Sequence, residues 1–217
     1  MSESKPDPEW SPGLPLQAVP FAILVAAALW LARHFYELPE RLPIHWNWRG
    51  QADGFVERSG VSVALPLLIG AVVCLMLAAV RSGLRRSVPA GAMRTATLKV
   101  LLGGEYFSAL ICCGVLAASV TSGRLLKPVL WFAFAAVVGL VVFAARLGRG
   151  IPREPERNPA AWRAGVFYVD RKDPALFVPK RSGFGYTFNF GHPAAIVLTV
   201  ATLVVPLAVA LGALLLR

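Results

Sequence analysis

The sequence predicts an all-α integral membrane protein with five transmembrane helices, a short extracytoplasmic lid and a small cytoplasmic β-meander. Of its 217 residues, 56% are hydrophobic and only 16% are charged. The apolar residues come in blocks rather than with a helical or strand period. Five blocks are long enough for the roughly 20 residues of helix that cross a hydrocarbon core of about 30 Å. These predicted spans are Leu14–Ala32, Val61–Val80, Thr95–Val120, Pro128–Ala145 and Pro193–Leu216.

The spans divide the chain into four predicted regions. We expect a cytoplasmic tail at 1–13, a four-helix membrane region at 14–145 that includes the lid loop 36–58, a cytoplasmic loop at 146–192 and a fifth transmembrane helix at 193–217. The tail lacks the basic start of a cleaved signal peptide, so the first span is expected to remain as an anchor.

The basic residues predict the orientation of the chain. With the amino terminus in the cytoplasm, 15 of the 22 Lys and Arg residues lie on the cytoplasmic side and 7 on the other. The positive-inside rule therefore favours a cytoplasmic amino terminus and an extracytoplasmic carboxy terminus. This orientation accounts for the net charge of +10, and no nucleic-acid recognition motif accompanies it, so no nucleic-acid partner is expected.

Seven basic residues next to the predicted spans or in the cytoplasmic loop are expected to contact anionic lipid head groups or a partner, because the cytoplasmic leaflet is negatively charged. They are Arg81, Arg85, Arg86, Arg171, Lys172, Lys180 and Arg181.

The segment from Tyr36 to Glu57, YELPERLPIHWNWRGQADGFVE, concentrates polar chemistry between two apolar spans. An extended IHWNWR alternates between an apolar edge and a polar edge. The polar edge and the turn after it supply the candidate ligand-binding residues His45, Asn47, Arg49 and Asp53. Tryptophans favour the membrane interface, so the expected anchors are Trp46 and Trp48 on the apolar edge and Trp131 on the fourth span.

The pattern LP-x-x-LP-I-H-W-N-x-x-G-x-x-D-G-F in this segment resembles the opening motif of the SdpI-like family of bacterial membrane proteins. The match falls on Leu38, Pro39, Pro43, His45, Trp46, Asn47, Gly50, Asp53, Gly54 and Phe55. This resemblance implies a bacterial inner-membrane protein associated with immunity to a secreted peptide toxin, or with signalling. A second stretch, RNPAAWRAGVFYVDRKDPALFVPKRSGFGYTFNFGHP, is similar to a small uncharacterised domain of related bacterial membrane proteins. Neither resemblance brings a known catalytic residue.

The third span holds the ionisable residue deepest in an apolar block, Glu105, with Ser108 on the same helical face. A carboxyl group is costly in hydrocarbon, so Glu105 is expected to face the bundle interior. Two interpretations remain open, a proton or ligand site and a structural carboxyl held by a neighbouring helix.

In the cytoplasmic loop, Gly165–Val169, Leu176–Val178 and Tyr186–Phe190 read as three short strands separated by turn residues. They predict a three-stranded meander that packs against the helix ends, because a sheet of this size is not stable alone.

Three functional classes follow. The first is a protein that binds or senses a peptide or other ligand through the lid, the second an accessory subunit of a larger membrane complex, and the third a membrane enzyme using Glu105 or His45. No catalytic triad, H-E-x-x-H motif, cofactor fingerprint or metal-ligand spacing is present in the sequence, so no catalytic residue, cofactor or metal is assigned. The expected partners are membrane lipids together with a peptide ligand or a larger complex.

Overall fold

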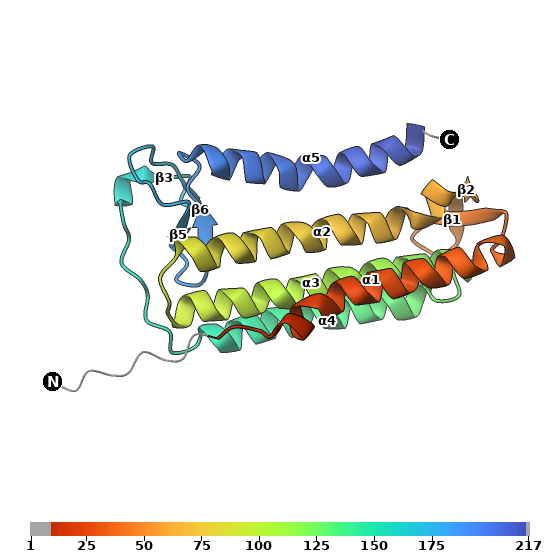
Figure 1. Ribbon diagram of the computed structural model, residues 1–217, viewed down its shortest axis with the longest axis horizontal. Coiled ribbons are helices and arrows are strands. Elements are labelled where there is room, and N and C mark those ends of the chain that lie inside the picture. The colour runs from red at the N-terminus through yellow and green to blue at the C-terminus, as the bar shows by residue number, and fades with distance from the viewer. Residues whose placement is uncertain (1–9, 216–217) are drawn as a thin grey trace.

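The computed structural model describes residues 10–215 as a bundle of long helices with small β-hairpins at both ends (Figure 1). In chain order the elements are α1 (Leu14–His34), a 3-10 turn (Phe35–Glu37), β1 (Arg41–Trp46), β2 (Ala52–Glu57), α2 (Gly60–Ser87), α3 (Ala92–Val120), α4 (Leu126–Gly148), a second 3-10 turn (Pro159–Ala161), β3 (Trp162–Arg163), β4 (Phe167–Tyr168), β5 (Phe177–Pro179), β6 (Tyr186–Phe188) and α5 (Pro193–Leu215). Helices α1, α2 and α3 pack on one another, α4 packs on α3, and α5 packs on α2.

The two ends of the bundle carry different structures (Figure 1). The lid end holds the β1–β2 hairpin and the turn between α3 and α4. The opposite end, here called the basic end, holds the connection between α2 and α3 and the long segment 149–192. Consecutive long helices run in opposite directions, so every second connection returns to the same end.

Four of the five predicted spans are confirmed as helices long and apolar enough to cross a membrane, which makes this a multi-pass membrane protein. They are α1 to α4. Helix α5 extends over Pro193–Leu215, and within it the stretch Pro193–Thr202 is an apolar helix shorter than a membrane span. The fifth crossing therefore stays a prediction.

Helix α2 runs seven residues beyond its predicted end at Val80. The prediction ended the span at the polar sequence Arg81-Ser82-Gly83, but the helix continues because Arg81 and Leu84 are both buried. Leu84 packs with Val88, Leu98 and Phe177 in a small apolar cluster at the basic end. Tertiary contacts here outweigh the weak helix propensity of Ser and Gly.

The predicted three-stranded meander is wrong. The loop forms two separate two-stranded hairpins, β3–β4 and β5–β6, joined by a single parallel bridge between Tyr168 and Asn189. The first predicted strand contains β4, which pairs antiparallel with the preceding residues Trp162–Arg163. This pairing forms because Ala164 and Gly165 adopt positive φ angles of 47° and 72° and close a tight turn. Only the pairing of the other two predicted strands matches the structure.

The charge distribution between the two ends predicts which end faces the cytoplasm. We expect a single cysteine at Arg49 in the lid hairpin to react with a membrane-impermeant thiol reagent on intact cells, and one at Lys172 at the basic end to react only after the membrane is opened. The background for this test has its three cysteines replaced, since Cys74, Cys112 and Cys113 are free. Labelling of position 172 from outside would reverse the assigned orientation.

Candidate functional site

The lid is a β-hairpin fixed to the ends of α1 and α2. Strands β1 and β2 pair antiparallel, with Leu42 opposite Val56 and His45 opposite Gly54. A Cβ atom on Gly54 would lie 2.8 Å from the Cβ of His45, so a side chain at this position would force the two strands apart. After β2, Arg58 Nη1 donates hydrogen bonds to the carbonyls of Tyr36 and Leu38 at 2.9 and 2.6 Å, which ties the hairpin to the chain leaving α1.

The start of α2 is fixed in the same place. Ser59 Oγ accepts a hydrogen bond from the Ser62 amide at 3.1 Å, and Ser62 Oγ accepts one from the Ser59 amide at 2.9 Å. This capping box satisfies amides that the first turn of a helix leaves without partners. The hairpin therefore enters α2 at a defined angle.

The polar edge of the hairpin brings together two of the four predicted ligand-binding residues. His45 Nδ1 lies 2.5 Å from Asp53 Oδ1, and both side chains are well exposed. Asn47 serves the hairpin itself, because its Oδ1 accepts hydrogen bonds from the amides of Arg49 and Gln51 at 2.9 and 3.0 Å. The histidine and the aspartate thus form an exposed pair on this edge, while the exposed Arg49 guanidinium lies over the Trp48 ring.

The apolar edge differs from the prediction. Strand β1 ends at Trp46, and Trp48 lies in the following turn, 88% exposed, with the Arg49 guanidinium 4.7 Å from its ring centre. The strict alternation of IHWNWR is broken because the pairing register shifts after Pro43 and the turn begins at Asn47. Trp46 packs against the α3–α4 turn, where a Cβ atom on Gly123 would come within 2.9 Å of the indole Nε1. Trp46 therefore anchors the lid to the bundle, whereas Trp48 extends outward.

An apolar groove of about 290 Å³ lies directly beneath the hairpin. Its roof is formed by Leu42, Ile44 and Val56, and its walls by α2 and α3. Ile44 and Val115 line the groove and are 47% and 41% exposed, so the groove is open beside them.

Pro66 in the wall of this groove changes the hydrogen bonding of α2. A proline inside a helix has no amide hydrogen, so the carbonyl of Ser62, four residues earlier, lacks its usual helical donor. Both residues line the groove. In α1 the comparable carbonyl of Leu16, four residues before Pro20, accepts a hydrogen bond from the Tyr106 hydroxyl at 2.8 Å. The bundle itself supplies a donor at Pro20.

A second polar centre lies inside the bundle at Glu105, whose side chain is fully buried as predicted. Arg81 Nε donates to Glu105 Oε1 at 2.9 Å, and Arg81 Nη2 donates to Oε2 at 3.3 Å. The third guanidinium nitrogen, Nη1, donates to Gln17 Oε1 at 2.8 Å. Ser108, one turn along α3, is also buried. This network joins α1, α2 and α3 and favours the structural interpretation of Glu105, because both its carboxylate oxygens are engaged by Arg81.

The assignment of Arg81 to lipid contact is wrong, since its side chain is only 6% exposed. The sequence did contain a signal for the correct partner. A carboxylate inside a membrane span needs a counter-charge or a donor, and Arg81 is the first basic residue after the second apolar block.

The other predicted basic and interfacial residues lie at the surface. Arg86, Arg171, Lys172 and Lys180 are exposed, and Arg85 is half-buried with its Nη2 donating to Ser11 Oγ at 3.0 Å. Arg181 pairs with Glu156 at 2.8 Å. Trp131 is 71% exposed near the start of α4, at the lid end. Their contacts with lipid stay predictions.

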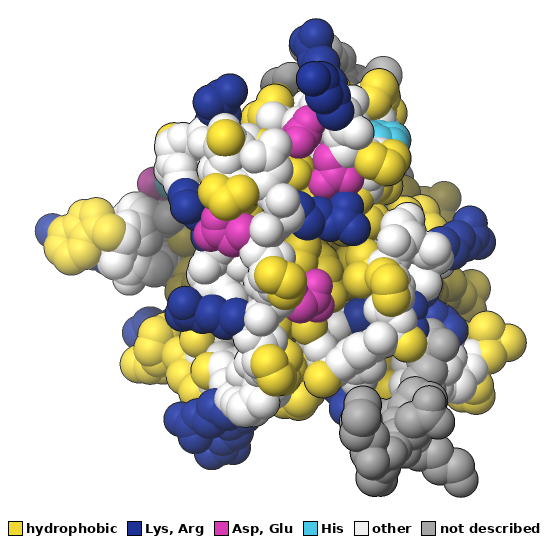
Figure 2. All heavy atoms as spheres, turned by 90° about the vertical axis from the view of Figure 1, so that its left-hand side faces the viewer, with side chains coloured by type: hydrophobic (Ala, Val, Ile, Leu, Met, Phe, Trp, Pro, Cys, Tyr) yellow, Lys and Arg dark blue, Asp and Glu magenta, His cyan; other side chains and the backbone are white. Residues whose placement is uncertain are grey.

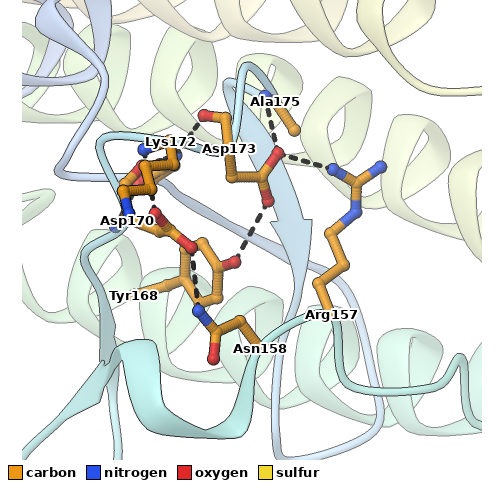
Figure 3. A network of polar contacts seen from close by, with 8 residues as sticks. Arg157, Asn158, Tyr168, Asp170, Lys172, Asp173 and Ala175 are labelled. Carbon is orange, nitrogen blue, oxygen red and sulfur yellow. Dashed lines mark hydrogen bonds and ion pairs between the residues drawn. The ribbon is translucent and has the colours of Figure 1, made fainter.

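The basic end holds a polar network around Tyr168 and Asp173 (Figure 3). Asp173 Oδ1 accepts from Arg157 at 2.8 Å and from the Ala175 amide at 2.9 Å, while Oδ2 accepts from the Tyr168 hydroxyl at 3.0 Å. Burial acts to raise the pKa of Asp173, but these hydrogen bonds outweigh it and lower the pKa below its ordinary value of 3.8. Burial, with the hydrogen bond to Asp173, raises the pKa of Tyr168 to about 12. The network fastens β4 to the segment that leads from it toward β5.

Among residues 10–215, no group of three or more His, Cys, Asp or Glu side chains could hold a metal ion.

The buried ion pair predicts a non-additive pattern of stability. Arg81→Leu and Glu105→Leu should each lower the free energy of unfolding by about 3–5 kcal/mol, because each leaves an unpaired charge in the bundle. The double variant should lose less than the sum of the two, since it removes both charges. Glu105→Gln should be milder than Glu105→Leu, because the amide oxygen still accepts from Arg81. Unfolding in mixed micelles measures these differences.

Arg86→Leu is the matched control, because Arg86 is an exposed arginine on the same helix. In micelles without anionic lipid or detergent it should leave stability nearly unchanged. Losses for Arg81→Leu and Glu105→Leu that simply add in the double variant would show that the two side chains act independently.

The lowered pKa of Asp173 predicts acid sensitivity at the basic end. Its stabilising contribution is present above pH of about 4 and is lost as the pH falls through the folded-state pKa, because the protonated carboxyl accepts these hydrogen bonds weakly. Hydrogen exchange over residues 157–190, corrected for intrinsic rates, should rise on acidification, and Asp173→Asn should raise it already at neutral pH. Equal protection of the parent from about pH 7 to about pH 3 would contradict this expectation.

Two segments of the chain match family models. Residues 22–70 match a domain of unknown function (DUF1648), and residues 171–196 match a family of unknown function (DUF5808). The first segment covers most of α1, the lid and the start of α2, and the second covers β5, β6 and the start of α5. No curated protein and no solved structure matches the chain. The chain is thus similar, at its lid and at its basic end, to uncharacterised families, which is consistent with an uncharacterised membrane protein family.

Proposed function

We propose that this protein is a membrane receptor or sensor that binds an amphipathic ligand, such as a peptide, at the lid. The observation that carries the proposal is the apolar groove beneath the hairpin, because it places a hydrophobic binding volume next to an exposed polar edge. The ligand's apolar part occupies the groove, and its polar part meets His45 and Asp53.

The groove combines the properties of a ligand pocket. It is concave and almost wholly apolar, with few polar groups, as small-molecule sites commonly are. Ser62 lines the groove, and its carbonyl lacks the usual helical donor at Pro66, so it can accept a hydrogen bond from a ligand. A ligand that donates a hydrogen bond to this carbonyl would do for α2 what the Tyr106 hydroxyl does for α1.

The polar edge supplies recognition outside the groove. His45 and Asp53 are exposed and held by a hairpin that is fixed at both ends, so their positions are set before any ligand arrives. A preorganised site loses little conformational entropy on binding. The resemblance to the SdpI-like family supports a secreted peptide as the ligand and immunity or signalling as the outcome.

The groove is tested by photo-crosslinking in cell membranes. A photoreactive amino acid at Ile44, which lines the groove, should capture a molecule that the same amino acid at Val137 does not. Val137 is the matched control, because it is 46% exposed on the lipid-facing surface of α4 and Ile44 is 47% exposed. Mass spectrometry of the adducts identifies what is captured.

Two further variants distinguish the contribution of the groove to ligand capture from that of the polar edge. Val115→Trp fills the groove and should abolish the Ile44 adduct, whereas His45→Ala with Asp53→Ala should weaken it without lowering the melting temperature. Capture of the same membrane phospholipids at positions 44 and 137 would refute a ligand site under the lid.

A further inference from the structure

The basic end of the molecule separates positive from negative charge. Figure 2 shows this end directly, with most Lys and Arg side chains projecting around its outline and Asp and Glu side chains closer to its centre. The acidic residues of segment 149–192 are engaged within the protein. Glu154 accepts from Tyr186, Glu156 from Arg181, Asp170 from Asn158, and Asp173 from Arg157.

Apart from the buried Arg94, five basic residues at this end belong to the ends of the membrane helices, and we call these five the cationic rim. Arg85 and Arg86 lie in the last turn of α2, Lys99 in the first turns of α3, and Arg146 and Arg149 at the end of α4. Because these helices are long enough to span a bilayer, their ends lie at the level of the lipid head groups.

The charges of the cationic rim are not neutralised by any carboxylate among residues 10–215. Within the described part of the chain, no carboxylate lies within ion-pair distance of any of the five. Arg85 contacts the neutral Ser11 hydroxyl, and the Lys99 ammonium lies 5.5 Å from the centre of the Trp10 ring. Arg86, Arg146 and Arg149 are exposed. By contrast, Arg81, one turn before Arg85, is buried against Glu105.

We propose that the cationic rim binds the head groups of anionic phospholipids. The negative charge of these head groups stabilises the bundle, because the described part of the protein places no carboxylate beside the rim. Basic side chains beside a membrane helix attract the anionic surface over about a Debye length. The opposite end carries fewer basic residues at helix ends, namely the exposed Arg33, Arg124 and Lys127. Its other arginines include Arg41 and Arg49 on the lid hairpin, where each guanidinium faces an aromatic ring. This site is separate from the groove and does not depend on the function proposed for the lid.

The test measures thermal stability of the full chain in nanodiscs of phosphatidylcholine alone and of phosphatidylcholine mixed with phosphatidylglycerol. Phosphatidylglycerol should raise the melting temperature, and high salt should reduce the rise. In Arg146→Gln/Arg149→Gln the rise should shrink by roughly two fifths, since two of five rim charges are gone and each contributes similarly. Arg146→Lys/Arg149→Lys should retain most of the rise because it keeps the charges.

The matched control is Arg41→Gln/Arg49→Gln, which removes two exposed arginines from the lid end and should keep the full response. Three results would overturn the proposal: no rise with phosphatidylglycerol in the parent, an equal loss in the lid control, or a loss with the lysine pair as large as with the glutamine pair. The glutamine and lysine pairs are compared with the parent in phosphatidylcholine first, so a general folding defect is seen there.

Discussion

The buried ion pair between Arg81 and Glu105 is the constraint on which the arrangement of the first three helices depends. An isolated carboxylate or guanidinium cannot stay in a membrane bundle at acceptable cost, so each charge requires the other at bonding distance. Through Gln17 the same guanidinium reaches α1. Sliding or rotating any of these helices would separate the charges, and the network therefore selects one packing of otherwise interchangeable apolar surfaces.

The lid depends on this packing and completes it. Its hairpin is held by Arg58 at the exit of α1, by the cap at the start of α2 and by Trp46 at the α3–α4 turn. Two of these supports lie in the α1–α2 connection and the third at the α3–α4 turn, so the hairpin keeps its place only while these helix ends stay together. In return it roofs the groove between α2 and α3. The groove therefore exists only when both the helix bundle and the lid are in place.

The two ends of the molecule differ in whether their carboxylates are accessible or hydrogen-bonded within the protein. At the lid end, His45 and Asp53 meet each other at the surface and remain accessible. At the basic end, carboxylates such as Asp173 accept hydrogen bonds within the segment that carries the short hairpins, which are too small to be stable alone. Within the described part of the chain, their engagement leaves Arg146 and Arg149 at the end of α4 without a carboxylate at ion-pair distance.

The sequence by itself determined the four long spans, because transfer of about 20 apolar residues into hydrocarbon is a local property of each segment. It also determined that Glu105 faces inward, since the cost of an exposed charge does not depend on the partner. Only the tertiary structure decided that the partner is Arg81, that Trp46 packs on the α3–α4 turn while Trp48 is exposed, and that the strands of segment 149–192 form two hairpins. Those outcomes depend on helix rotation, strand register and turn closure, which bring together groups far apart in sequence and leave no trace in local hydropathy.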